Sequence, residues 1–220
     1  GAGRIALEYS TDSNGAVTAS TVTDALGTRR HYTFTGIAGA VRNTGITQPC
    51  GEACSTTAQV SYDANANPAS RIDFKGHRTT FVYDQQRNLE ISRTEAADTA
   101  LARTITTQWH ATLRLPVLIT EPGRTTTFDY DSKGNLLEKT VTDTASGNFR
   151  VWRYTWNNRG QILTVDGPRT DLDDITTYAY YSDNTANHKQ FDLASVTDAL
   201  GHTTLFNRYD ANGHLLEVTD

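Results

Sequence analysis

The sequence has no methionine, and cysteine and proline are scarce, with two and five residues among 220. It has no apolar run long enough for a membrane-spanning helix or a signal peptide. Basic residues are not in excess: the net charge of −5 and the pI of about 5.7 argue against a nucleic-acid partner. Because the chain begins with glycine and lacks methionine, we expect it to be a piece of a longer protein.

The two cysteines, Cys50 and Cys54, lie in the stretch QPCGEACSTT. A disulfide between them would close a very small loop and add little stability. A metal site would require two further ligands, and no Cys/His motif stands nearby. We therefore expect a local loop disulfide or free thiols, and no bound metal.

Apolar residues are also few, at 37%, and the mean hydropathy is −0.52. Aromatic residues nevertheless reach 9%, and there are 36 threonines, a β-branched residue that suits a pleated, half-exposed surface. Disordered chains lack both of these classes. The composition predicts a folded, β-rich chain without a thick core.

An internal repeat organises the sequence. A Tyr-Asp pair recurs as Tyr62-Asp63, Tyr83-Asp84, Tyr130-Asp131 and Tyr209-Asp210, and the first two tyrosines are 21 residues apart. Degenerate copies retain an aromatic residue at this place: Tyr9, Phe34, Trp109, Trp156 and Tyr181. We assign a structural repeat role to Tyr62, Asp63, Tyr83, Asp84, Trp109, Tyr130, Asp131, Gly134, Trp156, Gly160, Tyr209, Asp210 and Gly213.

Each repeat reads as a β-hairpin. In TTTFDYDSKGNLLEKTVTD, Thr126, Phe128 and Tyr130 alternate with polar residues, which indicates a two-faced strand. Asp131 and Gly134 then stand first and fourth, as in a type I turn, and glycine tolerates the positive φ of a bulged loop. The returning strand begins at Leu136.

A second acidic-Gly turn follows each returning strand. It occurs at Asp24–Gly27, Asp73–Gly76, Glu121–Gly123, Asp166–Pro168 and Asp198–Gly201. Two turns per repeat predict a continuous antiparallel meander over residues 1–220, a single array without a linker. The final copy has one extra residue before Tyr209, which predicts a bulge. The insertions 36–57, 95–103, 144–150 and 183–189 are rich in Gly, Ala, Asn, Asp and Thr and are expected to be loops or extended hairpin tips.

The stretches YDANANPASRIDFKGHRTTFVYDQQRNLE and VTDALGHTTLFNRYDANGHLLEVTD resemble the Rhs or YD-repeat family along nearly the whole chain. The resemblance implies an all-β fold, in which repeated antiparallel hairpins form a curved, continuous sheet strip. In that family the strip spirals into a hollow shell around a toxin payload, in bacterial polymorphic toxins and insecticidal toxin complexes, and teneurins contain a similar barrel. Self-cleaving members carry Asp-Pro motifs, and this sequence has no Asp-Pro dipeptide.

No enzymatic motif stands out. The six histidines show no His-Glu-x-x-His spacing, and there is no Gly-x-Ser-x-Gly elbow or phosphate-binding loop. His77 and His202 follow turn glycines, so we expect surface positions. The acidic run 171–174 is interpreted as a solvated loop rather than a calcium site, and Asp143–Gly147 only faintly echoes an aspartic protease motif. We expect no catalysis and no cofactor.

The resemblance thus implies a non-catalytic structural segment of a secreted or cell-surface shell that encloses or presents a toxin or effector. Its expected partners are the rest of the parent chain and the payload, and its exposed strand edges predict self-association. The alternative is a glycan- or receptor-binding module that presents the repeated aromatics. The structural interpretation of those aromatics is packing of each ring on its counterpart in the next hairpin, with the aspartate capping a turn.

Overall fold

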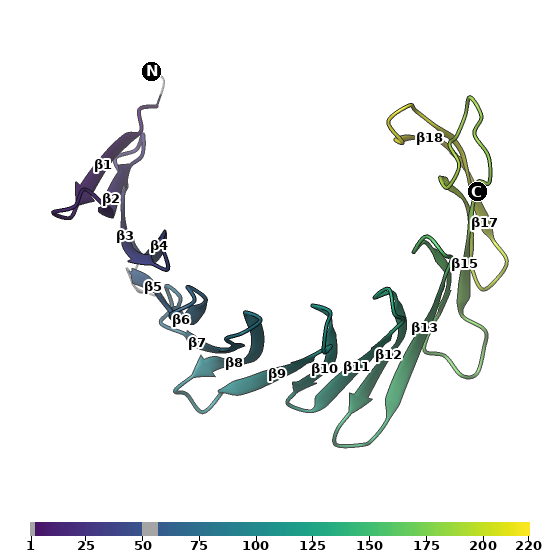
Figure 1. The fold of residues 1–220 in the computed structure, drawn as a ribbon, viewed down its shortest axis with the longest axis horizontal. Coiled ribbons are helices and arrows are strands. Elements are labelled where there is room, and N and C mark those ends of the chain that lie inside the picture. Colours follow the sequence, from purple (N-terminus) through teal and green to yellow (C-terminus); the bar gives the residue numbers. More distant parts are fainter. Residues whose placement is uncertain (1–2, 50–56) are drawn as a thin grey trace. The chain divides into compact units, whose positions relative to one another are not determined.

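The computed structural model describes residues 3–49 and 57–220 and divides them into two units, Gly1–Trp109 and His110–Asp220 (Figure 1). All regular structure in the described residues is β-strand, so no helix there is long and apolar enough to cross a membrane. The predicted all-β hairpin fold is confirmed. Cys50 and Cys54 lie outside the described residues.

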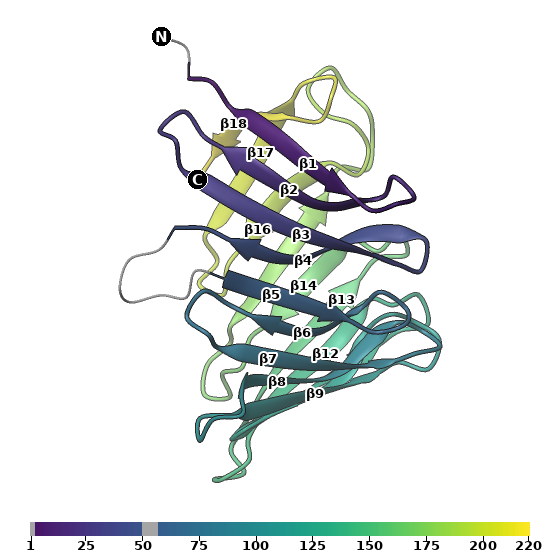
Figure 2. The same cartoon turned by 90° about the vertical axis from the view of Figure 1, so that its left-hand side faces the viewer.

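The first unit is a meander in which every strand pairs antiparallel with the next one along the chain (Figure 2). Its strands are β1 (Ala6–Thr11), β2 (Val17–Thr23), β3 (Arg29–Ile37), β4 (Ala40–Thr47), β5 (Thr57–Tyr62), β6 (Pro68–Ile72), β7 (Arg78–Asp84), β8 (Leu89–Ala97) and β9 (Arg103–Trp109).

The second unit repeats this arrangement. Its strands are β10 (Pro116–Glu121), β11 (Arg124–Tyr130), β12 (Leu136–Asp143), β13 (Phe149–Trp156), β14 (Ile162–Asp166), β15 (Ile175–Tyr180), β16 (Leu193–Thr197), β17 (Thr203–Tyr209) and β18 (Leu215–Thr219).

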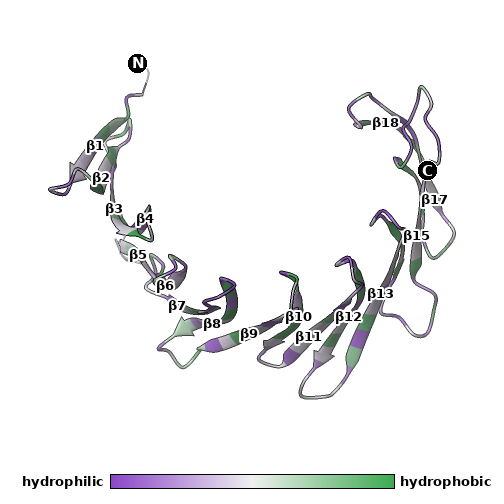
Figure 3. Ribbon diagram, in the orientation of Figure 1, coloured by the Kyte–Doolittle hydropathy of each residue, from purple (hydrophilic) through white to green (hydrophobic). Residues whose placement is uncertain are grey.

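Neither unit has a thick core. Among the described residues, Leu89, Ala97 and Ile105 are the buried apolar ones, and no side chain falls below 2% exposure. Apolar and polar residues mix along the strands (Figure 3). Each unit is a single layer, so its stability depends on contacts between neighbouring hairpins more than on a shared interior.

The register separates two chemically distinct faces, because paired residues of an antiparallel sheet point to the same side. In β11, Thr126, Phe128 and Tyr130 are less exposed than Thr127 and Asp129, which confirms the predicted alternation. The opposite face is rich in hydroxyls that bond across strands. Examples are Thr94–Thr104 at 2.9 Å, Thr155–Thr164 at 2.6 Å, Thr197–Thr203 at 2.8 Å and Ser61–Ser70 at 2.7 Å.

The predicted bulge before Tyr209 is confirmed, since Phe206 pairs with Val218 and Arg208 with Glu217, leaving Asn207 between them. The insertions are predicted to be loops or extended hairpin tips. Glu95–Ala97 belong to β8 and Phe149 and Arg150 belong to β13, so these two insertions extend hairpins. The expectation is wrong for the segment 36–57, which contains the whole strand β4. Small and polar residues there continue the main-chain pairing, because a hairpin tip needs no apolar side chain to extend its ladder. Asp183–Lys189 form a loop as expected.

Candidate functional site: the repeated hairpin corner

One five-residue turn recurs at both ends of the hairpins. The amide of its first residue donates to the carbonyl of the fifth, and the amide of the fourth donates to the carbonyl of the first, as at Asp131, Gly134 and Asn135 (2.9 and 3.0 Å). The first side chain accepts from the amides of the third and fifth residues through one oxygen. Turns of this kind begin at Asp12, Asp24, Asp63, Asp73, Asp131, Asn157, Asp198 and Asp210.

The fourth residue of the turn adopts a left-handed conformation. Gly134 has φ 87°, Gly160 79° and Gly213 82°, which confirms the positive φ predicted for Gly134. Ala66 holds the same place in the turn that begins at Asp63, with φ 62°. A Cβ disfavours this region, so Ala66 carries backbone strain that its glycine counterparts avoid.

The turn hydrogen bonds lower the pKa of six leading carboxylates, those of Asp24, Asp63, Asp73, Asp131, Asp198 and Asp210. For Asp131 the largest cause is the side-chain bond from Asn135, and for Asp210 it is the bond from His214. For Asp63 the largest cause is the side chain of Gln85, which belongs to the next corner. The ionised form of these groups is the one that accepts the turn amides.

Asp84 departs from the pattern. Its carboxylate accepts from the amides of Gln86 and Arg87, and Asn88 has φ 50°. The loop before Leu89 is therefore of a different kind. Two of the second turns also differ: Pro122 and Gly123 form a two-residue connection between β10 and β11, and a longer loop joins Asp166 to Ile175.

Several corners are preceded by an aromatic residue that reaches back to the preceding hairpin. In the first unit, the Tyr62 hydroxyl donates to the carbonyl of Asn43 at 2.7 Å, and Trp109 Nε1 donates to that of Glu90 at 2.8 Å. Asn43 lies opposite Phe34 and Glu90 lies opposite Tyr83. Each bond thus ends on the residue paired with the previous aromatic of the series.

In the second unit the bonds of Trp156, Tyr180 and Tyr209 follow the same rule, since Leu136, Ile162 and Leu193 lie opposite Tyr130, Trp156 and Tyr180. The bonds are Tyr130 to Pro116 at 2.9 Å, Trp156 to Leu136 at 2.7 Å, Tyr180 to Ile162 at 2.9 Å and Tyr209 to Leu193 at 2.8 Å. We call Tyr62, Trp109, Tyr130, Trp156, Tyr180 and Tyr209 the corner aromatics. All of them are half-buried. Burial raises the pKa of Tyr130, Tyr180 and Tyr209, and likewise that of Tyr83.

The predicted ring-on-ring contact is not what joins these residues in the described chain. Among the described residues, the corner aromatic that stacks on another ring is Tyr130, and its partner Phe128 lies in the same strand, β11, with centroids 6.4 Å apart. The link between hairpins is instead polar, from a ring donor to a main-chain acceptor. That acceptor has no signature in the sequence, since every residue has a carbonyl.

The assignment of Tyr181 to the repeated aromatic position is wrong by one residue. Tyr180, not Tyr181, holds the corner position, and it lies opposite Leu193. The Tyr181 ring stacks on His188 with centroids 3.5 Å apart, and its hydroxyl donates to the carbonyl of Phe206 at 2.9 Å. Two adjacent tyrosines made the repeat ambiguous in the sequence.

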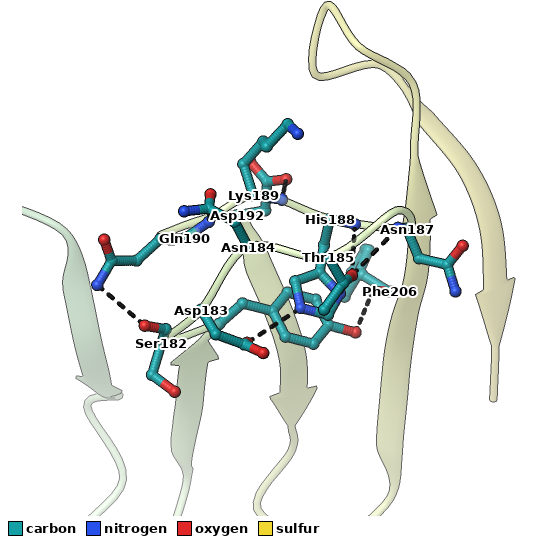
Figure 4. Close-up of polar contacts among 11 residues, drawn as sticks. Ser182, Asp183, Asn184, Thr185, Asn187, His188, Lys189, Gln190, Asp192 and Phe206 are labelled. Carbon is teal, nitrogen blue, oxygen red and sulfur yellow. Dashed lines mark hydrogen bonds and ion pairs between the residues drawn. The ribbon is translucent and has the colours of Figure 1, made fainter.

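The loop after Tyr181 is held by its own side chains (Figure 4). Thr185 accepts from the amide of Asn187, Gln190 donates to the carbonyl of Ser182, and His188 lies 3.1 Å from Asp183. The Asn187 carbonyl accepts from the amide of Tyr209 at 2.7 Å. This loop therefore ties the β15–β16 hairpin to β17.

Neighbouring corners also contact each other directly. Lys133 Nζ donates to the carbonyl of Asn158 at 2.9 Å, and Asn65 Nδ2 donates to that of Gln85 at 2.9 Å. Gln161 Nε2 donates to the carbonyl of Phe191 at 2.8 Å. Each of these bonds joins two successive corners of the same unit.

The other candidate residues lie apart. His77 and His202 are exposed and bond to the leading aspartates of their own turns, Asp73 and Asp198. In the acidic run, Asp171 pairs with Arg169 at 2.8 Å. No group of three or more potential metal ligands occurs within residues 3–49 and 57–220.

Residues 192–220 match the family model described as RHS Repeat. The resemblance to the Rhs family is confirmed. The matched segment contains both turns of an Rhs repeat, at Asp198 and Asp210, and the corner aromatic Tyr209. No curated protein matches the sequence.

Solved structures share the fold along almost the whole chain. The crystal structure of TcdB2-TccC3 matches with a TM-score of 0.68 at 14% identity, covering 96% of this chain and 11% of that one. The TcdB2-TccC3-Cdc42 structure matches with 0.66 at 15% identity and the same two coverages. The Photorhabdus luminescens Tc holotoxin pore, with a mutation in TccC3, matches with 0.61 at 14% identity, covering 97% of this chain and 12% of that one. The chain spans about a ninth of those proteins, and the identities establish a common fold alone.

Proposed function

We propose that this chain is a non-catalytic wall segment of an Rhs-repeat protein, part of a β-shell that encloses or presents a toxin or effector payload. The observation that carries the proposal is the series of hydrogen bonds from the corner aromatics to the preceding hairpins. These bonds join successive hairpins without an interior, which is what a one-layer wall requires. The Rhs match and the shared fold with Tc toxin structures support it.

In this proposal the residues predicted from the repeat have structural roles. Tyr62, Trp109, Tyr130, Trp156 and Tyr209 link hairpins, and the leading aspartates and turn glycines close the corners. Residues 1–220 form one array, whose partners are the remainder of the parent chain and its payload. The parent is exported or displayed at the cell surface.

The corner aromatics do not favour the glycan-binding alternative. Each is half-buried, and its polar ring atom is used by a main-chain carbonyl. Few of these rings would therefore present a free face and a free donor to a sugar.

A protease-protection assay on the full-length parent tests the proposal. The payload should resist digestion while the parent is intact and become sensitive once the wall is unfolded by mild denaturant. A payload that is digested at the same rate in both states would contradict an enclosing role.

A further inference from the structure

A groove of about 720 Å³ lies over β6, β7 and β8 of the first unit. Arg71 pairs with Thr79, and Phe81 pairs with Arg93, so all four side chains belong to one face. Its volume lies in the range of small-molecule sites. The full lining is Arg71, His77, Thr79, Phe81, Arg93, Glu95, Ala96, Thr99 and Leu101.

The groove holds one guanidinium that no carboxylate neutralises. Arg93 lies 3.1 Å from Glu95 and 3.4 Å from Glu90, and Arg103 lies 2.9 Å from Glu95. Arg71 has no ion pair in the part of the chain that the structure describes, and its guanidinium lies 5.6 Å from the centre of the Phe81 ring. Glu95 is shared by two arginines, so it offers little repulsion to an anion.

The rim is held in a strained conformation. Ala96 has φ 49° and Asp98 has φ 68°, both left-handed and neither a glycine. Arg78 fixes Asp98 through a contact of 2.9 Å, and the Thr99 hydroxyl donates to the Ala96 carbonyl at 2.7 Å. Strain of this kind is retained where the surrounding structure fixes a shape, and it is frequent at ligand sites.

A peptide could not add to this groove as a strand, because the main chains of its floor pair with each other. The lining instead combines the flat ring of Phe81, the apolar side chains of Ala96 and Leu101, the threonine hydroxyls and the imidazole of His77. His77 uses Nδ1 with Asp73, at 3.2 Å, which leaves Nε2 for a ligand. This mixture suits a small ligand that has apolar faces, several hydroxyls and one negative charge.

We propose that the groove binds a carboxylated sugar. The carboxylate accepts hydrogen bonds from the Arg71 guanidinium in the two-pronged geometry that arginine favours. The sugar ring lies against Phe81, and its hydroxyls meet His77 and Thr79. The exposed Leu101 adds an apolar side chain to the lining. This goes beyond the role as a wall segment, which does not require it.

The test is a titration of the 220-residue chain with the methyl glycosides of N-acetylneuraminic acid and glucuronic acid, followed by two-dimensional NMR. Methyl galactoside serves as the neutral probe, and a glutamate-rich peptide as the acidic polypeptide probe. Arg71→Ala removes the positive charge. Arg71→Lys retains the charge but lacks the planar guanidinium that can donate two parallel hydrogen bonds to a carboxylate. Lys139→Ala is the matched control, because Lys139 also lies over a ring, that of Trp152 at 4.9 Å, in the second unit. Circular dichroism checks that each variant is folded.

The expected result is binding of at least one acidic glycoside, with shifts centred on β6–β8. Arg71→Ala should weaken it by about tenfold or more, the effect of losing a hydrogen bond to a charged group. Arg71→Lys should weaken it less, and Lys139→Ala should leave it unchanged. The proposal is overturned by binding of neither acidic glycoside, by equal binding of galactoside, by indifference to Arg71→Ala, or by stronger binding of the peptide. None of these outcomes affects the protease-protection result.

Discussion

The indole Nε1 of Trp156 donates a 2.7 Å hydrogen bond to the carbonyl of Leu136, and Leu136 is the residue opposite Tyr130. A ring in one hairpin thus ends on the partner of the equivalent ring in the hairpin before it. Because the acceptor belongs to the main chain, the link survives changes of side chain at position 136. The repeat therefore needs an aromatic donor only once per hairpin.

Removing one such donor should loosen the joint between two hairpins. Tyr130→Phe deletes the hydroxyl that bonds to the carbonyl of Pro116 and leaves the ring in place. The free energy of unfolding should fall by about 0.5–1.5 kcal/mol, the net value of one hydrogen bond. Urea denaturation measures it. Tyr178→Phe is the control, since no hydrogen bond of its hydroxyl is recorded in the described chain, and an equal loss in both variants would count against the joint.

Glycine at position 66 should stabilise the turn that begins at Asp63. Ala66→Gly relieves the left-handed strain at φ 62° and should raise the free energy of unfolding by about 0.5–1 kcal/mol. Gly76→Ala is the reciprocal change, at φ 79° with open space around a new Cβ, and should lower it by about 1 kcal/mol or more. Thermal unfolding of the two variants should move in opposite directions. If both melting temperatures rose or both fell, the left-handed φ at these positions would not be what determines the change in stability.

The leading residue of the turn should tolerate asparagine but not alanine. Asn157 already accepts the amides of Arg159 and Gln161 with its side-chain oxygen. Asp131→Asn should therefore remain close to the wild type, whereas Asp131→Ala leaves two turn amides without their acceptor. Melting temperatures at neutral pH give the ranking, and an alanine variant as stable as the asparagine variant would refute it.

Stability should decrease in acid. The folded state lowers the pKa of Asp63, Asp73, Asp131, Asp198 and Asp210 below the ordinary value of 3.8. A lowered folded pKa contributes stability that is present above the unfolded pKa and is lost as pH falls through the folded pKa. Urea midpoints should therefore hold from neutral pH down to about pH 4 and drop below it. Constant midpoints down to about pH 2 would show that the turn carboxylates do not contribute.

Self-association should depend on β18. Every residue of this strand is exposed, including Leu215, Leu216 and Val218. End strands of repeat arrays pair with other copies, and a charged residue blocks such pairing. Sedimentation velocity should show concentration-dependent assembly of the chain, reduced by Val218→Lys. Leu200→Lys, at an exposed turn position, should not reduce it. A strictly monomeric wild type at high concentration would rule the association out.

The sequence predicted the hairpins well because their signals are local. Alternation along Thr126, Phe128 and Tyr130, and a glycine fourth after Asp131, depend only on a residue and its near neighbours. The extra residue before Tyr209 predicted its bulge for the same reason. The repeat spacing then identified which hairpins are equivalent.

What joins the hairpins could not be predicted in this way. The acceptors of the corner aromatics are carbonyls 14 to 20 residues away, and no side chain marks them. The choice between Tyr180 and Tyr181 depends on the register with Leu193, which spacing alone leaves open. The groove is hidden for a related reason, because Arg71, Phe81 and Arg93 meet only through the pairing of three strands.

The most direct test of the account is electron cryo-microscopy of the full-length parent. We predict a hollow particle whose wall contains residues 1–220 as one layer of hairpins, with payload density inside. A solid particle, or a payload located away from a wall that contains these residues, would contradict the proposed role.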